Sequence, residues 1–207
     1  GGSTFTKAFN VQGKTCRFTV EAPGAFAQFR KRINLLDKDY YLSLNGELRG
    51  GVVQESGKSG ALFWFTEDRK YILKTIERCE VTKLIAMLED YGDHLEFNES
   101  SLLSRYYGVY AFSYNGEEFL VVAMNNVFQT GAKLNFVYDL KGTTEDRYVA
   151  PEPKAVLKDL NFADKTLRFA EERTRRHLVH RIHNDAYFLA RQNIMDYSII
   201  LGIHYLD

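Results

Sequence analysis

The sequence has little cysteine, no excess of either charge and no long apolar run, and each shortage excludes a class of protein. Its 207 residues contain 2 cysteines, Cys16 and Cys79, whose wide separation fits no metal or redox motif and suits a reducing compartment. Lysine plus arginine and aspartate plus glutamate number 27 each. This balance gives no global basic field, so we expect no nucleic-acid partner. No apolar stretch approaches the roughly 20 residues that span a bilayer, and no secretory signal is present.

The chain does have enough apolar material for a core. Apolar residues make up 45% and aromatic residues 14% of the sequence, which suffices for one large domain or two small lobes. The first three residues, Gly-Gly-Ser, are typical of a cloning remnant. Helical spacing predicts helices near 24–36 and 78–91, the second ending near Gly92. Alternation and turn signals predict a mostly antiparallel sheet with strands in 61–65, 69–76, 103–114, 117–124 and 135–142.

The composition changes after residues 150–154. Residues 166–191 are rich in arginine and histidine and carry apolar side chains spaced by three or four, which predicts a long amphipathic helix. A β-branched run, 193–207, comes next and predicts strands. The second half therefore begins a more helical region.

The stretch GGVVQESGKSG, Gly50–Gly60, contains the Gly-Lys-Ser of a phosphate-binding P-loop. A P-loop needs a glycine with four residues between it and that tripeptide, but Val52 holds the position and Gly51 stands one residue too early. The residues after it are strand-like, so no helix N-terminus is available for phosphate. A P-loop nucleoside triphosphatase is therefore the poorest of the functions we consider.

Lys74 is a charge on an apolar strand. Alternation in YILKTI places it with Ile72 and Ile76, on the face that we expect to be buried. A strand lysine often extends its stem to reach solvent. However, a glycine-rich loop, a strand, a turn and then an inward lysine is also the layout that binds nucleotide phosphates in protein kinases, where a helix glutamate orients the lysine. Glu80 is the nearest candidate for that glutamate.

Asp196 is a second such charge, because large apolar side chains flank it in IMDYSIILGI. A carboxylate buried there without a partner costs several kcal/mol. It is either a turn or capping aspartate before a strand or a carboxylate that accepts the proton of an attacking hydroxyl. Lys74 and Asp196 act together only if two lobes close over a nucleotide.

Five segments in order resemble the signature segments of the phosphatidylinositol phosphate kinases. They are SGKSGALFWFTEDRKYILKTI, VVAMNNVF, VYDLKGTT, LKDLNF and NIMDYSIILGIHYLD, and the resemblance covers about residues 18–207. It implies an α+β, protein-kinase-like, two-lobed fold. An antiparallel-sheet N-lobe would span 4–128, and 129–207 would form the hinge, a linker and the first part of a helical C-lobe.

The resemblance also assigns roles to residues. Lys74 matches the lysine that contacts ATP phosphates and Asp196 the catalytic aspartate. Lys141, in the DLKG segment, is either a second phosphate contact or a turn lysine. The implied nucleotide-binding residues, from the glycine loop, the lysine strand, the hinge, DLKG and the base-facing position, are Ser56, Gly57, Ser59, Gly60, Ile72, Met124, Asn126, Val127, Phe128, Lys141 and Ile200.

The implied activity is transfer of the γ-phosphoryl group of ATP, with Mg²⁺, to an inositol ring hydroxyl of a phosphatidylinositol monophosphate. The family continues past Gly202-Ile203-His204 into a segment with a magnesium-binding aspartate and an activation loop, and these 207 residues contain neither. No residue is therefore expected to be a metal ligand. The alternative is a catalytically incomplete fragment or pseudokinase that acts as a nucleotide- or lipid-binding scaffold. The implied setting is cytoplasmic, peripheral at the cytosolic face of anionic membranes, with a possible homodimer.

Overall fold

The structure, a computed structural model, describes residues 3–53, 61–114, 116–129, 131–153 and 155–206, with the backbone alone at 51–53. The chain divides into two compact units, Gly1–Gln129 and Thr130–Asp207. The described residues form an α+β protein with four α-helices and a large antiparallel sheet, which confirms the predicted class.

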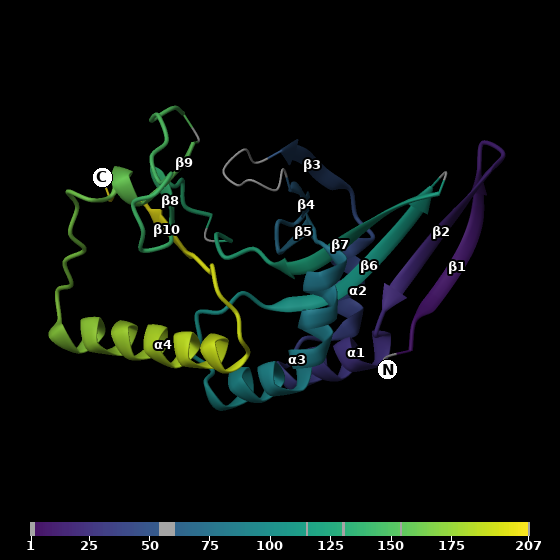
Figure 1. The fold of residues 1–207 in the computed structure, drawn as a ribbon, viewed down its shortest axis with the longest axis horizontal. Helices are drawn as coiled ribbons and strands as arrows, with labels where there is room; N and C mark the ends of the chain where they lie inside the picture. The colour runs from purple at the N-terminus through teal and green to yellow at the C-terminus, as the bar shows by residue number, and fades with distance from the viewer. Residues whose placement is uncertain (1–2, 54–60, 115, 130, 154, 207) are drawn as a thin grey trace. The chain divides into compact units, whose positions relative to one another are not determined.

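The first unit is built on a seven-stranded sheet in the order β1-β2-β6-β7-β5-β4-β3 (Figure 1). Every neighbouring pair in it is antiparallel. The predicted hairpin β4–β5 and the predicted pair β6–β7 are confirmed, while the sequence did not predict β1, β2 and β3. The strands are β1 (Phe5–Val11), β2 (Lys14–Glu21), β3 (Leu48–Val53), β4 (Leu62–Thr66), β5 (Tyr71–Thr75), β6 (Tyr106–Tyr114) and β7 (Glu117–Asn125).

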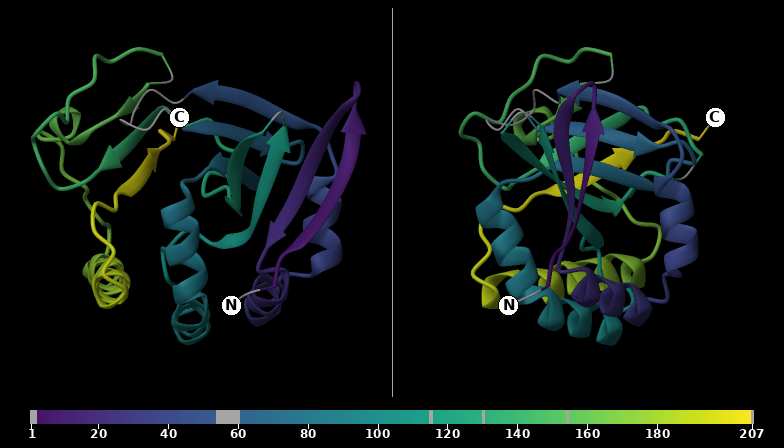
Figure 2. Two further views of the ribbon diagram at one scale, coloured as in Figure 1. Left: turned by 45° about the vertical axis from the view of Figure 1, so that its right-hand side comes forward. Right: turned by 90° about the vertical axis from the view of Figure 1, so that its right-hand side faces the viewer.

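Three helices accompany this sheet, and two of them, α1 and α3, lie side by side (Figure 2). They are α1 (Pro23–Arg32), α2 (Asp37–Leu44) and α3 (Arg78–Phe97). The predicted helix at 24–36 is thus shorter, and α2 comes after it separately. A capping box begins α3: the Glu80 carboxylate accepts the backbone N–H of Glu77 at 2.9 Å, while the Glu77 side chain accepts a backbone N–H in return.

The prediction that the second helix ends near Gly92 was wrong, because α3 continues to Phe97. Gly92 is buried inside the helix, and a Cβ there would lie 3.0 Å from Nη1 of Arg32. Arg32 reaches from the end of α1 to pair with Asp93 and Glu96 of α3. The glycine therefore makes room for the side chain that joins the two helices, instead of ending one of them.

The core of the first unit is aromatic. Tyr40, Phe26 and Phe29 are almost completely buried, and the hydroxyls of Tyr40 and Tyr110 share a hydrogen bond of 2.7 Å. Tyr40 also contacts Tyr71 edge to face, with ring centroids 5.3 Å apart. Such large rings bury much apolar area per residue, so the tyrosines and phenylalanines contribute strongly to this core.

The second unit has a three-stranded sheet in the order β10-β8-β9. The pair β8–β10 is antiparallel and β8–β9 is parallel. The long helix was predicted from residue 166, but it begins six residues later, at Glu172. The elements are β8 (Phe136–Leu140), β9 (Val156–Leu157), the 3-10 helix η1 (Asp159–Asn161), α4 (Glu172–Arg191) and β10 (Ile199–Ile203).

Candidate functional site

Lys74 lies in β5 on the same face as Ile72, as alternation predicted, but the expectation that this face is the buried one was wrong. Tyr71 and Leu73 are the buried residues of this strand, whereas Ile72 and Lys74 are part-exposed. Both faces of β5 carry apolar residues, so alternation alone could not identify the core face. Lys74 therefore has access to solvent, and its ammonium lies over the ring of Phe63, 5.8 Å from the centroid.

Glu80 was the expected partner of Lys74, but its carboxylate makes a different contact. It closes the capping box of α3 on the Glu77 N–H. Among the described residues no carboxylate lies within 4.0 Å of the Lys74 ammonium. The Lys74 ammonium therefore has no carboxylate partner in the described part of the chain and is available to bind an anion from outside it.

The segment after β7 contains the residues expected to hold adenine. Ile72 pairs with Met124 across β5 and β7, so these two expected contacts are neighbours. Asn126 fixes the segment, since its N–H donates to Lys70 O at 2.9 Å and its side-chain amide donates to Arg69 O at 2.8 Å. Val127 is exposed, and the Phe128 N–H donates to Asn126 Oδ1 at 3.1 Å. The roles of these residues toward nucleotide stay predictions.

The expected nucleotide loop residues Ser56, Gly57, Ser59 and Gly60 lie outside the described residues. The next element of the chain is the strand β4, as the sequence predicted, and not the helix that a P-loop requires. Gly50 belongs to β3 and not to a loop. Its φ is +136°, it adjoins a bulge, and a Cβ there would lie 2.6 Å from Phe63 O, so that position requires glycine.

Asp196 lies in a bend between α4 and β10, with a left-handed φ of 61°. Of the two alternatives left open by the sequence, the position agrees with an aspartate on a turn before a strand, since the residue is exposed and its apolar neighbour Met195 is 86% exposed. No desolvation cost arises there. Ile200, in β10, pairs with Asp139 of β8 and is also exposed, at 45%. The catalytic role of Asp196 stays a prediction, now for an accessible carboxylate on a turn.

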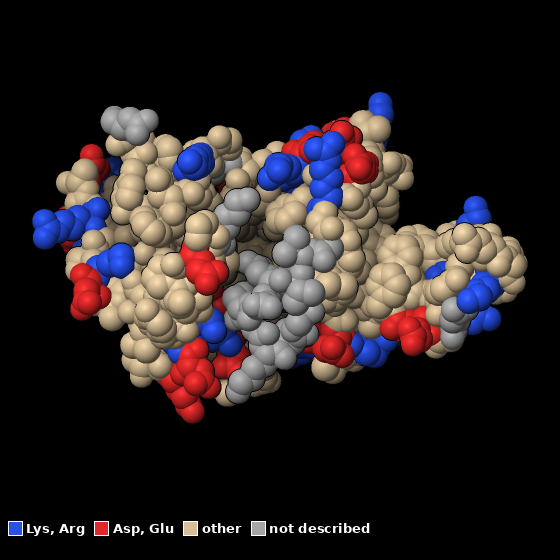
Figure 3. Space-filling model, turned by 90° about the horizontal axis from the view of Figure 1, so that it is seen from above, with Lys and Arg blue, Asp and Glu red and all other residues tan. Residues whose placement is uncertain are grey.

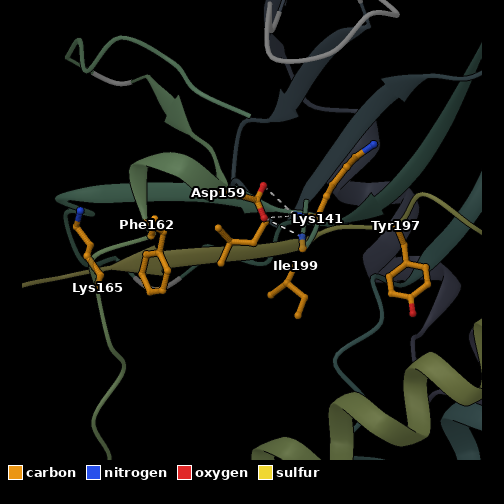
Figure 4. Close-up of a pocket in the computed structure, with 9 residues that line it drawn as sticks. Lys141, Asp159, Phe162, Lys165, Tyr197 and Ile199 are labelled. Atoms are coloured by element: carbon orange, nitrogen blue, oxygen red, sulfur yellow. Dashed lines mark hydrogen bonds between the residues drawn. The ribbon is translucent and has the colours of Figure 1, made fainter. Parts of the chain in front are cut away.

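A pocket of about 430 Å³ opens beside the end of β8, within the second unit (Figure 4). Lys141 and Gly142 form part of its wall. Asp159 faces their backbone amides, while the Lys141 ammonium points away from that carboxylate (Figure 4). The pocket is lined by Leu140, Lys141, Gly142, Asp159, Phe162, Ala163, Lys165, Tyr197 and Ile199.

Two residues that the sequence did not single out hold this pocket wall. Asp159 accepts the N–H of Gly142 at 2.8 Å and that of Lys141 at 3.0 Å, and Arg147 Nε donates to its other oxygen at 2.7 Å. Arg147 also donates to the Asp139 carbonyl and pairs with its carboxylate at 3.3 Å. The segment LKDLNF contains Asp159, but nothing in its spacing links it to residues 12 to 18 positions earlier.

The same contacts determine the protonation of Asp159. Partial burial alone raises the pKa of its carboxyl, but hydrogen bonds from Arg147 and from the amides of Gly142 and Lys141 outweigh it. The pKa of Asp159 therefore lies below its ordinary value. At neutral pH the carboxylate is ionised and keeps all its hydrogen-bond acceptors.

Charge elsewhere is mixed. On the face seen in Figure 3, basic and acidic side chains of the described residues are scattered among uncharged ones. On α4, Arg175 pairs with Glu172 at 2.6 Å.

Within the described ranges, no three histidine, cysteine or acidic side chains gather to hold a metal ion. The helices of those ranges also include none with the length and apolarity to cross a membrane.

Comparison with known proteins supports the resemblance. The family model described as Phosphatidylinositol-4-phosphate 5-Kinase matches residues 51–207. The chain is 34% identical to human phosphatidylinositol 4-phosphate 5-kinase type-1 beta. The match covers the whole of this chain and 39% of the human protein. It is 35% identical to the type-1 sktl kinase of Drosophila melanogaster, again over its whole length and 26% of that protein.

A plant relative gives the same result. Phosphatidylinositol 4-phosphate 5-kinase 7 of Arabidopsis thaliana is 33% identical over 88% of this chain and 24% of its own. The α+β fold with its antiparallel sheet is consistent with the N-lobe of a kinase. The chain belongs to the phosphatidylinositol phosphate kinase family. It spans between about a quarter and two fifths of the length of these three relatives.

Proposed function

We propose that this chain is the nucleotide-binding part of a phosphatidylinositol monophosphate kinase, which transfers the γ-phosphoryl group of ATP to an inositol ring hydroxyl. The observation that carries the proposal is the family match over residues 51–207. The names of the human, fly and plant relatives describe kinases that act on phosphatidylinositol 4-phosphate. That lipid is therefore the first substrate to test, and the 5-hydroxyl the first position.

Three residues have proposed roles. The part-exposed ammonium of Lys74, with no carboxylate beside it among the described residues, would bind ATP phosphates. Lys141 would make a second phosphate contact. Asp196, exposed in its bend, would orient the attacking hydroxyl and accept its proton.

ATP would supply the phosphoryl group and Mg²⁺ would neutralise its charge. The described residues fit ATP better than they fit the metal. Among the described residues, Lys74 and Lys141 have no carboxylate within 4.0 Å of their ammonium groups, whereas no three histidine, cysteine or acidic side chains gather to hold a metal ion. We therefore assign no metal ligand in this chain.

The experiment is transfer of labelled phosphate from ATP to phosphatidylinositol 4-phosphate vesicles. We expect Lys74→Ala to lower turnover by about 10²-fold or more, and Asp196→Asn by about 10²-fold to 10⁴-fold. Lys70→Ala is the matched control, because Lys70 is an exposed lysine of the same hairpin. Turnover that survives both Lys74→Ala and Asp196→Asn would sink the assignment.

A second candidate is a nucleotide- or lipid-binding scaffold without turnover. This candidate assigns to the 207 residues, which span 24% to 39% of the length of the plant and human relatives, the binding step alone. Thermal shift with ATP, with and without Mg²⁺, run beside the transfer assay separates the two candidates. Nucleotide-dependent stabilisation without labelled lipid identifies the scaffold, whereas both signals together identify the kinase.

The proposed setting is the cytosolic face of anionic membranes, with a possible homodimer. The first half of α4 is exposed and carries Arg173, Arg175 and Arg176, and basic side chains near anionic lipid contribute about 1 kcal/mol each. Glu172 pairs with two of them, which reduces their net attraction. Sedimentation with anionic liposomes at rising salt, with these arginines changed to alanine, tests this setting. Unchanged binding would exclude α4 as the docking element.

A further inference from the structure

Lys141 is presented by a turn that the rest of the unit holds from behind. β8 is paired on both sides and ends at Leu140, after which the chain turns at Lys141 and Gly142. Gly142 has a φ of +76°, in the left-handed region that other residues seldom adopt. A turn of this kind leaves backbone N–H groups without strand partners, so something else must accept them.

Asp159 accepts both of those N–H groups. Its Oδ1 lies 2.8 Å from the nitrogen of Gly142 and 3.0 Å from that of Lys141, and its Oδ2 lies 3.2 Å from the latter. The Asp159 side chain is only 14% exposed, so its geometry is closely constrained. The Lys141 ammonium belongs to the same turn and would be an alternative partner for this carboxylate.

Arg147 explains why the carboxylate binds the backbone and not that ammonium. Its Nε donates to Asp159 Oδ2 at 2.7 Å, and its side chain, 8% exposed, also binds the carbonyl and carboxylate of Asp139 in β8. The charge of the Asp159 carboxylate is thereby neutralised by Arg147 of the same unit. Among the described residues, no carboxylate comes within 4.0 Å of the Lys141 ammonium.

We propose that Asp159 and Arg147 are positioning residues for Lys141. They fix its backbone, they satisfy the charge of Asp159 without using the lysine, and they leave the ammonium available to an anionic phosphoryl group. This inference rests on the proposed function, in which Lys141 contacts a phosphate of ATP. It adds two residues that act on the nucleotide only through the lysine.

The test is a double-mutant cycle read by the affinity for Mg-ATP, measured by calorimetry on the full chain. We expect Lys141→Ala to weaken binding about 10-fold, and Asp159→Ala to weaken it by a similar factor. The double variant should bind no more weakly than Lys141→Ala alone, because Asp159 acts through the lysine. Asp164→Ala is the matched control: it removes an exposed carboxylate five positions after Asp159 and should leave affinity unchanged.

A second measurement does not depend on nucleotide. The backbone amide of Gly142, followed by NMR in labelled protein, should titrate with the Asp159 carboxyl as the pH is lowered through its depressed pKa. Lys141→Ala should keep that titration and Asp159→Asn should abolish it. Asparagine retains one acceptor oxygen without the charge, so this variant also serves if Asp159→Ala does not fold.

The outcomes are distinct. A wild-type chain that does not bind Mg-ATP overturns the proposed function and this role with it. Binding by the wild type, with a loss from Asp159→Ala that is just as large in the Lys141→Ala background, overturns the positioning role alone. The same is true of a Gly142 amide that ignores pH. Coupled affinities and a titrating amide support the role.

Discussion

Among the described residues, each unit has one buried arginine, and the two are held in different ways. In the first unit, Arg30 donates to Asp37 at 2.6 Å and to the Tyr107 carbonyl at 2.7 Å, and it lies 4.9 Å from the ring centroid of Tyr40. In the second unit, Arg147 binds two aspartates and a strand carbonyl, without a ring contact of that kind among the described residues.

The surroundings of the two arginines differ more than their contacts. Asp37, the partner of Arg30, is 52% exposed, whereas Asp139 and Asp159 are 16% and 14% exposed. The described apolar side chains that are buried in the second unit are Tyr138, Leu157 and Phe188, and all the others belong to the first. The first unit is thus held mainly by apolar burial, and the second depends more on its polar network.

The largest effect should come from Arg147→Met. This change leaves two carboxylates of low exposure without a cation, and breaking a buried pair in this way costs about 3–5 kcal/mol. We expect the second unit to unfold at distinctly lower denaturant concentration, as measured by the fluorescence of a probe in that unit. Adding Asp159→Asn should restore part of the loss; no restoration would contradict the electrostatic explanation.

Arg30→Met should cost less, about 2–3 kcal/mol. The exposed Asp37 can be hydrated again, so the main losses are the unpaired Tyr107 carbonyl and packing against Tyr40. Chemical denaturation followed by tyrosine fluorescence measures it. If Arg30→Met proved more damaging than Arg147→Met, the contrast between the two units would be reversed.

Asp68→Asn should cost about 1 kcal/mol at neutral pH. Partial burial raises the pKa of this carboxyl, but hydrogen bonds from Ser43, Thr66 and the Lys70 N–H lower it by more, and the net pKa is about 2. The side chain is 36% exposed, so screening reduces the gain. A depressed pKa contributes stability above about 3.8 that is lost as pH falls toward 2. The wild type should therefore lose its advantage over the variant in that window, as acid titration of unfolding will show.

Gly92→Ala should have the smallest effect. Alanine gains about 1 kcal/mol over glycine in a helix interior, but its Cβ would lie 3.0 Å from the end of the Arg32 side chain, which must shift. We expect the two effects to cancel to within about 0.5 kcal/mol in thermal unfolding. The double variant with Arg32→Ala should then be more stable than Arg32→Ala alone, because the obstruction is gone.

The sequence predicted the elements whose signals are local. The hairpin β4–β5, the strands β6 and β7 and the start of α3 agree with alternation, turn residues and helical spacing. It did not predict β1, because every residue of that strand is exposed, so no buried face marks it. It chose the wrong face of β5 because both faces are apolar, and Ile72 looked as suitable for the core as Leu73.

For the candidate site, the sequence singled out individual residues but not the contacts between them. Asp196 was singled out because apolar side chains flank it in the sequence, yet Met195, Ile199 and Ile200 are themselves exposed. The ion pair of Arg147 and Asp159 was not predicted, because it joins an irregular segment to a 3-10 helix 12 positions away. Such pairs depend on the tertiary structure, and the spacing of residues in the sequence does not reveal them.

The left-handed backbone of Asp196 decides which variants can test its chemistry. Asparagine adopts a φ near 61° at least as readily as aspartate, and glycine adopts it freely, whereas alanine there would cost about 1–2 kcal/mol. Loss of turnover in Asp196→Ala would therefore mix a missing carboxylate with a displaced turn. Asp196→Asn and Asp196→Gly keep the bend, and together they isolate the carboxylate as the variable.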